Sequence, residues 1–359
     1  MADQTQLTDA VASIESPLLV GRTLGELGLV KGVAKKMTGG VKVDLLLPAG
    51  PPASLNDRLQ EVLAPFATGA DVNIELMGEE EVSTWMADLK EKAGPGIGEP
   101  GSATRTIAIS SGKGGVGKSS ISANLAVALA RAGKLVGIVD GDIWGFSIPA
   151  MLGVETPPIM VGDMIVPPVA HRVKVMSMDF FVGEDKAVIW RGPMLHKAIE
   201  QFLKDVFWDS LDFLIVDMPP GTGDIAISMA QFLPRAQVVV ATTPQPTAQR
   251  VARRAALMAK EVDQEVIGVV ENMSWFTGDD GTRYELFGSG GGQILADELG
   301  VELMARVPLL PEMGRGADEG RPVVLAAPGS EAETAFDALA AAVIEKRPRI
   351  RTNPALVIN

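Results

Sequence analysis

A glycine-rich stretch containing two lysines follows the apolar run Thr106–Ser110 and precedes a helix-like run, Ser120–Ala132. It matches the pattern G-x-x-x-x-G-K-[ST], in which glycines let successive backbone N–H groups turn toward phosphate oxygens. The new helix adds its positive end, Lys118 bridges the β- and γ-phosphates, and the Ser119 hydroxyl ligates Mg²⁺. The stretch therefore predicts a nucleotide site formed by Gly112, Lys113, Gly114, Gly115, Val116, Gly117, Lys118, Ser119 and Ser120.

Two further apolar runs end in aspartates that suit a metal ion. Phe213–Val216 leads into Asp217, and Leu135–Val139 leads into Asp140. Strands of one parallel sheet present their carboxyl ends at the same edge, where Mg²⁺ bound to the phosphates would lie. We therefore expect Asp217 to hold Mg²⁺ together with Ser119, and Asp140 to lie at the metal as well.

The elements that must position these groups follow from the hydrophobic pattern of the second part of the chain. Short apolar runs alternate there with helical patterns, which indicates parallel strands covered by helices. The sequence predicts an α/β fold with a doubly wound, mostly parallel sheet. Its predicted strands are Thr106–Ser110, Leu135–Val139, Val173–Met176, Phe213–Val216, Gln237–Ala241, Val266–Val270 and Glu302–Val307.

A smaller unit precedes this sheet. Alternating apolar residues over 41–47 indicate a strand with one buried face, and a helix capped by Ser54 and a strand at Val72–Leu76 follow. Four glycines and two prolines between Ala93 and Thr104 are typical of a linker. We predict a small α+β domain over residues 1–90, a linker over 91–104, the nucleotide-binding domain over 105–347 and a tail over 348–359.

Composition excludes several classes of site. The 45 acidic and 32 basic residues give a formal net charge of -13, which repels nucleic-acid phosphates and anionic lipids. The chain has no cysteine and two histidines, which excludes disulfides, a thiolate nucleophile and Cys-ligated zinc. It shows neither a signal-peptide pattern nor an apolar run of about 18 residues. We expect a cytoplasmic protein that binds neither nucleic acid nor membrane.

Lys113 adds a second lysine to the loop, which therefore resembles the deviant Walker A motif K-G-G-V-G-K-[ST] of the MinD, ParA and nitrogenase-iron-protein class. The resemblance implies a homodimer that encloses two nucleotides, with Lys113 reaching the partner's nucleotide and stabilising transition-state charge. Asp142 matches the aspartate of that class that orients the attacking water. The catalytic groups implied by the resemblance are Lys113, Lys118 and Asp142.

Further stretches narrow the resemblance to the Mrp/ApbC family of P-loop ATPases. They are Asp140–Pro149, Val188–Phe202, the stretch DMPPGTGDIA from Asp217, Glu271–Met273 and Phe287–Gly292. The first 78 residues also resemble the MIP18-like domain that is often fused to this family.

This family resemblance implies ATP and Mg²⁺ as ligands, slow hydrolysis and an iron–sulfur cluster held between two subunits. It implies iron–sulfur apoproteins or cluster-assembly proteins as partners. It also implies that Asn272 recognises adenine and that Pro308 flanks the base.

The chain departs from the family where the cluster is held. The family's carriers have a C-x-x-C pair after the asparagine, whereas Thr277–Gly281 stands at that place here. Iron in such clusters needs thiolate ligands, and Asp279 and Asp280 are poor replacements. A thiolate-held cluster on this chain's own residues is therefore excluded.

Three functions stay open from the sequence. The first, which we favour, is an ATPase of this family that serves iron–sulfur cluster assembly or transfer without cysteine ligands of its own. The second is a MinD/ParA-like, ATP-dependent dimerisation switch with a different protein client. The third is a module that binds nucleotide without turnover, against which the intact set of Lys113, Lys118, Asp142 and Asp217 argues.

Overall fold

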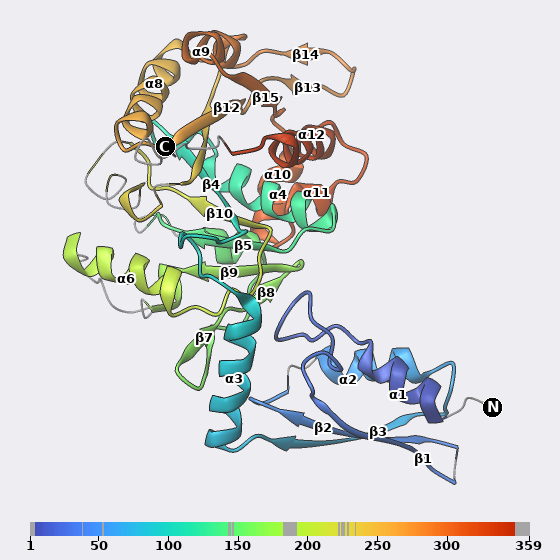
Figure 1. The fold of residues 1–359 in the computed structure, drawn as a ribbon. Helices are drawn as coiled ribbons and strands as arrows, with labels where there is room; N and C mark the ends of the chain where they lie inside the picture. The colour runs from blue at the N-terminus through green and yellow to red at the C-terminus, as the bar shows by residue number, and fades with distance from the viewer. Residues whose placement is uncertain are drawn as a thin grey trace, which may run out of the picture.

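A computed structural model describes residues 4–37, 39–51, 54–142, 145, 147–181, 192–221, 223, 227, 230–233 and 235–348. Parts of three stretches that carry the family resemblance lie outside these residues, namely parts of Asp140–Pro149, of Val188–Phe202 and of the stretch from Asp217. The described chain forms one large and one small sheet, each covered by helices (Figure 1).

The large sheet has eight strands in the order β15-β12-β11-β4-β10-β5-β9-β8. Neighbouring strands pair in parallel except β8 and β9, which are antiparallel. The strands are β4 (Arg105–Ser111), β5 (Val136–Asp140), β8 (Val169–Ala170), β9 (Val173–Ser177), β10 (Phe213–Asp217), β11 (Gln237–Thr242), β12 (Glu265–Glu271) and β15 (Glu302–Arg306). The predicted parallel sheet is confirmed, and each of its seven predicted strands ends within about one residue of the prediction.

Helices cover both faces of the large sheet, because successive strand residues point to opposite sides. In β10, Phe213 and Ile215 belong to one hydrophobic core, and Leu214 and Val216 belong to the other. The first core is covered by α4 (Lys118–Arg131), α5 (Ile148–Met151), α10 (Pro311–Asp318), α11 (Val323–Ala326) and α12 (Glu331–Glu345). The second core is covered by α6 (Gly192–Lys204), α8 (Pro246–Glu261) and α9 (Gly291–Leu299).

The small sheet contains β1 (Val30–Lys35), β2 (Val41–Leu47) and β3 (Ala70–Leu76), with β2 antiparallel to β1 and parallel to β3. α1 (Gln4–Ala12) packs on β1 and on α2 (Ser54–Leu63), and α3 (Glu79–Ala93) follows β3. Alternate residues of β2 are buried, which confirms the predicted strand, and the predicted helix begins at Ser54. The division of the chain into domains stays a prediction.

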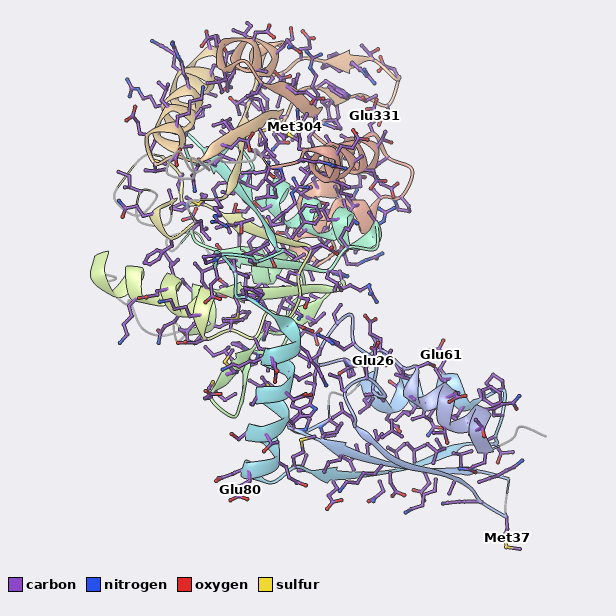
Figure 2. The ribbon with its side chains drawn as sticks, in the orientation of Figure 1. Glu26, Met37, Glu61, Glu80, Met304 and Glu331 are labelled. Carbon is purple, nitrogen blue, oxygen red and sulfur yellow. The ribbon has the colours of Figure 1, made fainter. Side chains whose placement is uncertain are left out.

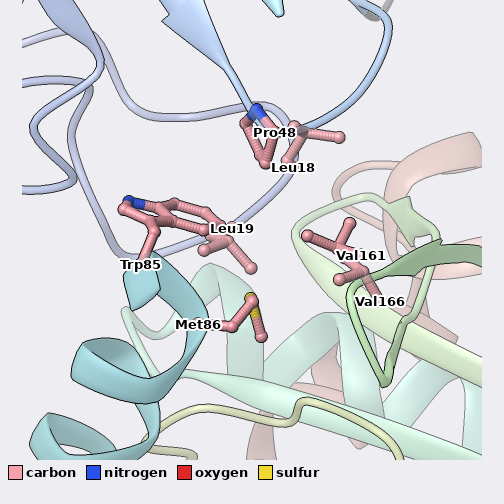
Figure 3. Close-up of a pocket in the computed structure, with 7 residues that line it drawn as sticks. All are labelled: Leu18, Leu19, Pro48, Trp85, Met86, Val161 and Val166. Atoms are coloured by element: carbon pink, nitrogen blue, oxygen red, sulfur yellow. The ribbon is translucent and has the colours of Figure 1, made fainter. Parts of the chain in front are cut away.

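A hairpin from the second part of the chain packs into the core of the small unit. It consists of β6 (Ile159–Val161) and β7 (Met164–Val166), which pair antiparallel. Val161, Met164 and Val166 belong to the same hydrophobic cluster as Leu19 and Met86, and Figure 3 shows Val161 and Val166 lining a small apolar cavity with both of those residues. Strands of three residues are too short to show an alternating pattern, so the sequence did not predict this hairpin.

Ion pairs reinforce the contact between the small unit and the large sheet. Arg22 donates from Nε and Nη2 to the two carboxylate oxygens of Asp209, at 2.9 and 2.7 Å. Arg172, between β8 and β9, pairs with Glu15. These contacts hold the small unit against the β8–β9 edge of the large sheet.

Short elements complete the described fold. A 3-10 helix spans Met178–Phe181, and the two-residue strands β13 (Phe276–Thr277) and β14 (Arg283–Tyr284) form an antiparallel pair. Within the described ranges, no helix has the length and apolar character needed to cross a bilayer.

The shared core predicts that hairpin side chains contribute to the stability of the small unit. Met164 is 6% exposed, so Met164→Ala should lower the free energy of unfolding by about 2–5 kcal/mol, the usual cost of truncating a buried methionine. Met160→Ala on the same hairpin is the matched control, because Met160 is 61% exposed and its truncation should change stability by less than about 0.5 kcal/mol. Chemical denaturation measures both, and equal stabilities would contradict the shared core.

Candidate functional site

The glycine-rich loop lies between β4 and α4, the order that the phosphate-binding motif requires. β4 ends at Ser111 and α4 begins at Lys118. Gly115 and Gly117 have φ angles of 78° and 81°, a region in which residues with a Cβ are strained. The loop conformation therefore depends on its glycines.

Two of the loop glycines also allow neighbouring segments to approach closely. A Cβ on Gly112 would lie 2.0 Å from the carbonyl carbon of Val251 in α8. A Cβ on Gly117 would lie 2.1 Å from Nδ2 of Asn272, directly after β12. The loop is thus packed against α8 on one side and against the end of β12 on the other.

Lys118, Ser119 and Asp217 lie together at the carboxyl edge of the large sheet. Lys118 Nζ donates to Asp217 Oδ2 at 2.7 Å, and the Ser119 hydroxyl donates to the same oxygen at 2.6 Å. Lys118 is 6% exposed and Asp217 is fully buried, so the two charges compensate each other away from water. The structure therefore brings together the predicted phosphate lysine and two of the predicted metal ligands.

Asp142 lies beside the same lysine. Its Oδ2 is 3.8 Å from Lys118 Nζ, and its carboxylate is partly exposed, unlike that of Asp217. A carboxylate at this point, next to the phosphate loop but open to solvent, can contact a water molecule. That position suits the role predicted for Asp142, which stays a prediction.

The carboxylate of Asp140 binds backbone N–H groups of the residues that follow it in the chain. It accepts backbone N–H groups from Asp142, Ser147 and Ile148, and Ser177 donates its hydroxyl at 3.3 Å. Burial, together with the adjacent negative charge of Asp217, raises the pKa of Asp140 to about 7. These contacts fix the segment that carries Asp142, and the predicted place of Asp140 at the metal stays a prediction.

Asn272 connects the end of β12 to the phosphate loop. Its side-chain Nδ2 donates to the Val116 carbonyl at 2.9 Å, and its Oδ1 is buried without a hydrogen-bond partner among the described residues. Backbone hydrogen bonds from Ser274 to Val307 and from Leu309 to Trp275 bring the segment around Pro308 beside it. Asn272 therefore contacts the loop, and the segment with Pro308 pairs with the residues that follow Asn272; the predicted contacts of both residues with the base stay predictions.

Lys113 lies in the partly exposed section of the loop. The Ser111 hydroxyl donates to its backbone carbonyl at 3.1 Å. In the described part of the chain its ammonium group forms no ion pair, in contrast to that of Lys118. Such a side chain can reach beyond its own site, although its role in a dimer stays a prediction.

The segment that replaces the cysteine pair is held by polar contacts. Glu331, labelled at the start of α12 in Figure 2, accepts hydrogen bonds from Trp275 Nε1 at 3.0 Å and Thr277 Oγ1 at 2.8 Å, and it pairs with Arg283. These donors, led by the Trp275 indole, lower the pKa of Glu331. Among the described residues no group of three or more His, Cys, Asp or Glu could hold a metal ion. With no cysteine in the chain, this segment does not fit an iron–sulfur cluster.

Two contacts at the site were not predicted from the sequence. Ser122 donates its hydroxyl to Asp217, and Val251 in α8 packs on Gly112. Ser122 follows Lys118 by four residues, the spacing that puts two side chains on one helix face, so a signal was available. No local signal connects Val251 to the loop.

The parallel sheet and the lysine–aspartate group at its edge define a P-loop NTPase of the ParA and MinD type. A family model described as "ParA: NUBPL iron-transfer P-loop NTPase" matches residues 102–344. The chain belongs to this family of iron-transfer P-loop NTPases.

Relatives of known name agree with this membership. The iron–sulfur cluster carrier protein of Mycobacterium tuberculosis is 43% identical over 324 residues, which is 86% of this chain and 85% of that protein. The protein of the same name from Bacillus subtilis is 40% identical over 316 residues, 86% of this chain and 89% of that protein. The predicted resemblance to the iron–sulfur cluster carrier family is confirmed.

Solved structures share the nucleotide-binding fold. A nucleotide-binding protein from Archaeoglobus fulgidus in complex with ADP has a TM-score of 0.57 and 32% identity, and the match covers 72% of this chain and 97% of that one. The septum site-determining protein MinD from Pyrococcus horikoshii, complexed with Mg-ADP, has a TM-score of 0.53 and 25% identity, covering 67% and 96%.

Lys118→Ala should abolish binding of Mg·ATP, because it removes the charge that would neutralise the β- and γ-phosphates. Isothermal titration calorimetry measures the binding, and thermal unfolding verifies that the variant is folded. Lys260→Ala, at an exposed lysine of α8, is the control and should bind like the unchanged protein. Tight Mg·ATP binding by folded Lys118→Ala protein would contradict the assignment of the loop.

Proposed function

We propose that the chain is a Mg²⁺-dependent ATPase that hydrolyses ATP slowly as a homodimer and serves iron–sulfur cluster assembly or transfer. The observation that carries the proposal is the contact of Lys118 and Ser119 with the buried Asp217, behind a glycine loop, in a member of this family. A cytoplasmic location, predicted from the sequence, remains part of the proposal.

The residues of the loop have separate tasks in ATP turnover. Lys118 neutralises the β- and γ-phosphates, and backbone N–H groups of the loop bind phosphate oxygens. Ser119 and Asp217 would hold Mg²⁺, which would compensate the remaining phosphate charge. Asp142, a partly exposed carboxylate 3.8 Å from Lys118 Nζ, orients the attacking water, and Lys113 of one subunit stabilises charge at the partner's nucleotide. Dimer assembly then limits the rate, since the nucleotide of a single subunit lacks the Lys113 that the partner supplies.

Adenine is the base that the edge of the loop favours. The exocyclic amino group of adenine is a hydrogen-bond donor, and the buried Oδ1 of Asn272 is an acceptor without a partner in the described residues. Pro308, a buried apolar residue, lies in the segment that pairs with residues 274 and 275, just after Asn272. The structures of relatives with ADP support this choice of nucleotide.

An iron–sulfur cluster would be cargo rather than a resident cofactor of this chain. The carriers named above are its relatives, yet the chain has no thiolate to ligate iron. The cluster ligands would therefore come from apoproteins or cluster-assembly proteins, and ATP turnover would control the contact with them. The missing thiolates are also the observation that supports a second candidate function. In it, the chain is a MinD/ParA-like dimerisation switch that serves a different protein client.

Mixing two inactive variants tests whether Lys113 acts on the nucleotide of the partner subunit. Lys113→Ala and Asp142→Asn should each lower ATP turnover by about 10²-fold or more, because each removes a group that acts in the transition state. If Lys113 acts on the partner's nucleotide, mixing the two variants should restore part of the turnover. Steady-state phosphate release measures this, with each variant alone as the control. No recovery in the mixture would argue against action across a dimer.

Anaerobic reconstitution with iron and sulfide tests the origin of the cluster ligands. The unchanged chain alone should retain no cluster after desalting, because it offers no thiolate. The matched variant carries Thr277→Cys and Asp280→Cys, which restores the C-x-x-C spacing in the β13–β14 segment and should retain iron and sulfide. Visible absorbance and bound-iron analysis measure both, and a stable cluster on the unchanged chain would contradict the proposal.

Recovery of bound proteins separates the two client classes. Affinity capture of the full chain with ATP and Mg²⁺ should return cluster-assembly proteins if the first candidate is correct. Return of septum or partition proteins in their place would favour the second candidate.

A further inference from the structure

Asp217 is held by three side chains of α4 in the described part of the structure. Lys118 Nζ and the Ser119 hydroxyl both donate to Oδ2, at 2.7 and 2.6 Å. The Ser122 hydroxyl lies 2.7 Å from the other oxygen, Oδ1. The two oxygens of the carboxylate therefore have different partners.

The partners of Oδ2 are the groups that a bound nucleotide would engage. This step rests on the proposed function, in which Lys118 neutralises phosphates and Ser119 holds Mg²⁺. Both groups then turn from Asp217 to the ligand, and Oδ2 becomes free for the metal. Ser122 has no such second task, because it lies one helical turn further along α4 and is fully buried.

The proton of Ser122 is directed to the carboxylate. Its hydroxyl oxygen is 3.0 Å from the Lys118 carbonyl and 2.7 Å from Asp217 Oδ1, and it has one proton to donate. The Lys118 carbonyl already accepts the backbone N–H of residue 122 in a regular helix. A charged acceptor at the shorter distance forms the stronger bond, so Oδ1 is its main acceptor.

Neighbouring donors do not replace Ser122. Asp140 is paired with Asp217 in the register of β5 and β10, but its two carboxylate oxygens are directed to the backbone N–H groups of 142, 147 and 148. Nearby, the Gly141 N–H donates to the backbone carbonyl of Asp217 and the Met218 N–H donates to the carbonyl of Ile109, so neither of these N–H groups binds the carboxylate. Once Lys118 and Ser119 contact the nucleotide, Ser122 is the donor that remains on Asp217 among the described residues.

We propose that Ser122 is the positioning residue for the magnesium site: its hydroxyl holds Oδ1 of Asp217 so that Oδ2 faces the metal. Groups that orient a metal ligand typically contribute tenfold to a hundredfold in metal affinity. The contribution is specific to the metal, because in the described structure the Ser122 hydroxyl is directed to Asp217 Oδ1 and the Lys118 carbonyl, not to the loop N–H groups or Asn272.

Ser122→Ala tests the proposal in the full chain. The affinity of the protein–ADP complex for Mn²⁺, measured by electron paramagnetic resonance, should fall by about tenfold to a hundredfold. Binding of ADP in the presence of a chelator, measured by calorimetry, should stay within about twofold, because Lys118 and the loop are unchanged. Unaltered Mn²⁺ affinity in the folded variant, or equal losses in both measurements, would overturn the proposal.

Two companion variants separate this effect from a general loss of packing. Ser16→Ala removes another buried hydroxyl, in the small unit, and should leave Mn²⁺ affinity unchanged. Ser122→Thr retains the hydroxyl and should keep Mn²⁺ affinity within about threefold of the unchanged protein, with thermal unfolding recorded for each variant. Loss of Mn²⁺ affinity in Ser16→Ala equal to that in Ser122→Ala would overturn the positioning role.

The unchanged protein shows whether the proposed function fails, whereas Ser122→Ala shows whether the role of Ser122 fails. If the unchanged protein binds no ADP with or without metal, the nucleotide site itself is wrong. If it binds ADP and Mn²⁺ and Ser122→Ala binds both equally well, the site is correct and the role of Ser122 is wrong.

Discussion

Lys118 and Asp217 form a buried pair of opposite charges, 2.7 Å apart, at the carboxyl edge of the parallel sheet. Removing one partner would leave the other charge buried and uncompensated, which costs several kcal/mol. The pair requires β10 beside β4, and the register that places Asp217 opposite Ile109 near the end of β4. It also requires α4 to begin directly after the loop. The Lys118–Asp217 contact therefore depends on the strand order, on the length of the loop and on the residue at which α4 begins.

The phosphate loop is shaped by its neighbours as well as by its own glycines. The Val251 backbone in α8 lies where a side chain on Gly112 would be, and Asn272 lies where one on Gly117 would be. Glu271 accepts a hydrogen bond from the Gly292 N–H at the start of α9, which fixes the end of β12 just before Asn272. The second half of the sheet therefore positions Asn272 and supports the loop, through the bond from Asn272 to the Val116 carbonyl.

Two other parts of the molecule are connected to this site through the chain. The loop with Asp142 continues through α5 into the β6–β7 hairpin, which lies in the hydrophobic core of the small unit. After Asn272 the chain continues into β13 and β14, which Glu331 holds through the Trp275 indole and the Thr277 hydroxyl. The iron–sulfur cluster carrier protein of Mycobacterium tuberculosis is 43% identical over 86% of this chain, while the present chain holds the second segment by polar contacts and has no thiolates.

The sequence by itself determined the phosphate loop, Asp217 and the seven main strands, because the loop motif and the short apolar runs are local patterns. It also determined that no thiolate is present. The tertiary structure decided that Ser122 reaches Asp217, that Asp140 binds the backbone after it, and that the hairpin at 159–166 completes the core of the small unit. Most of these contacts join segments far apart in the chain: Ser122 and Asp217 are 95 positions apart, and only the packed sheet and helices bring such segments together.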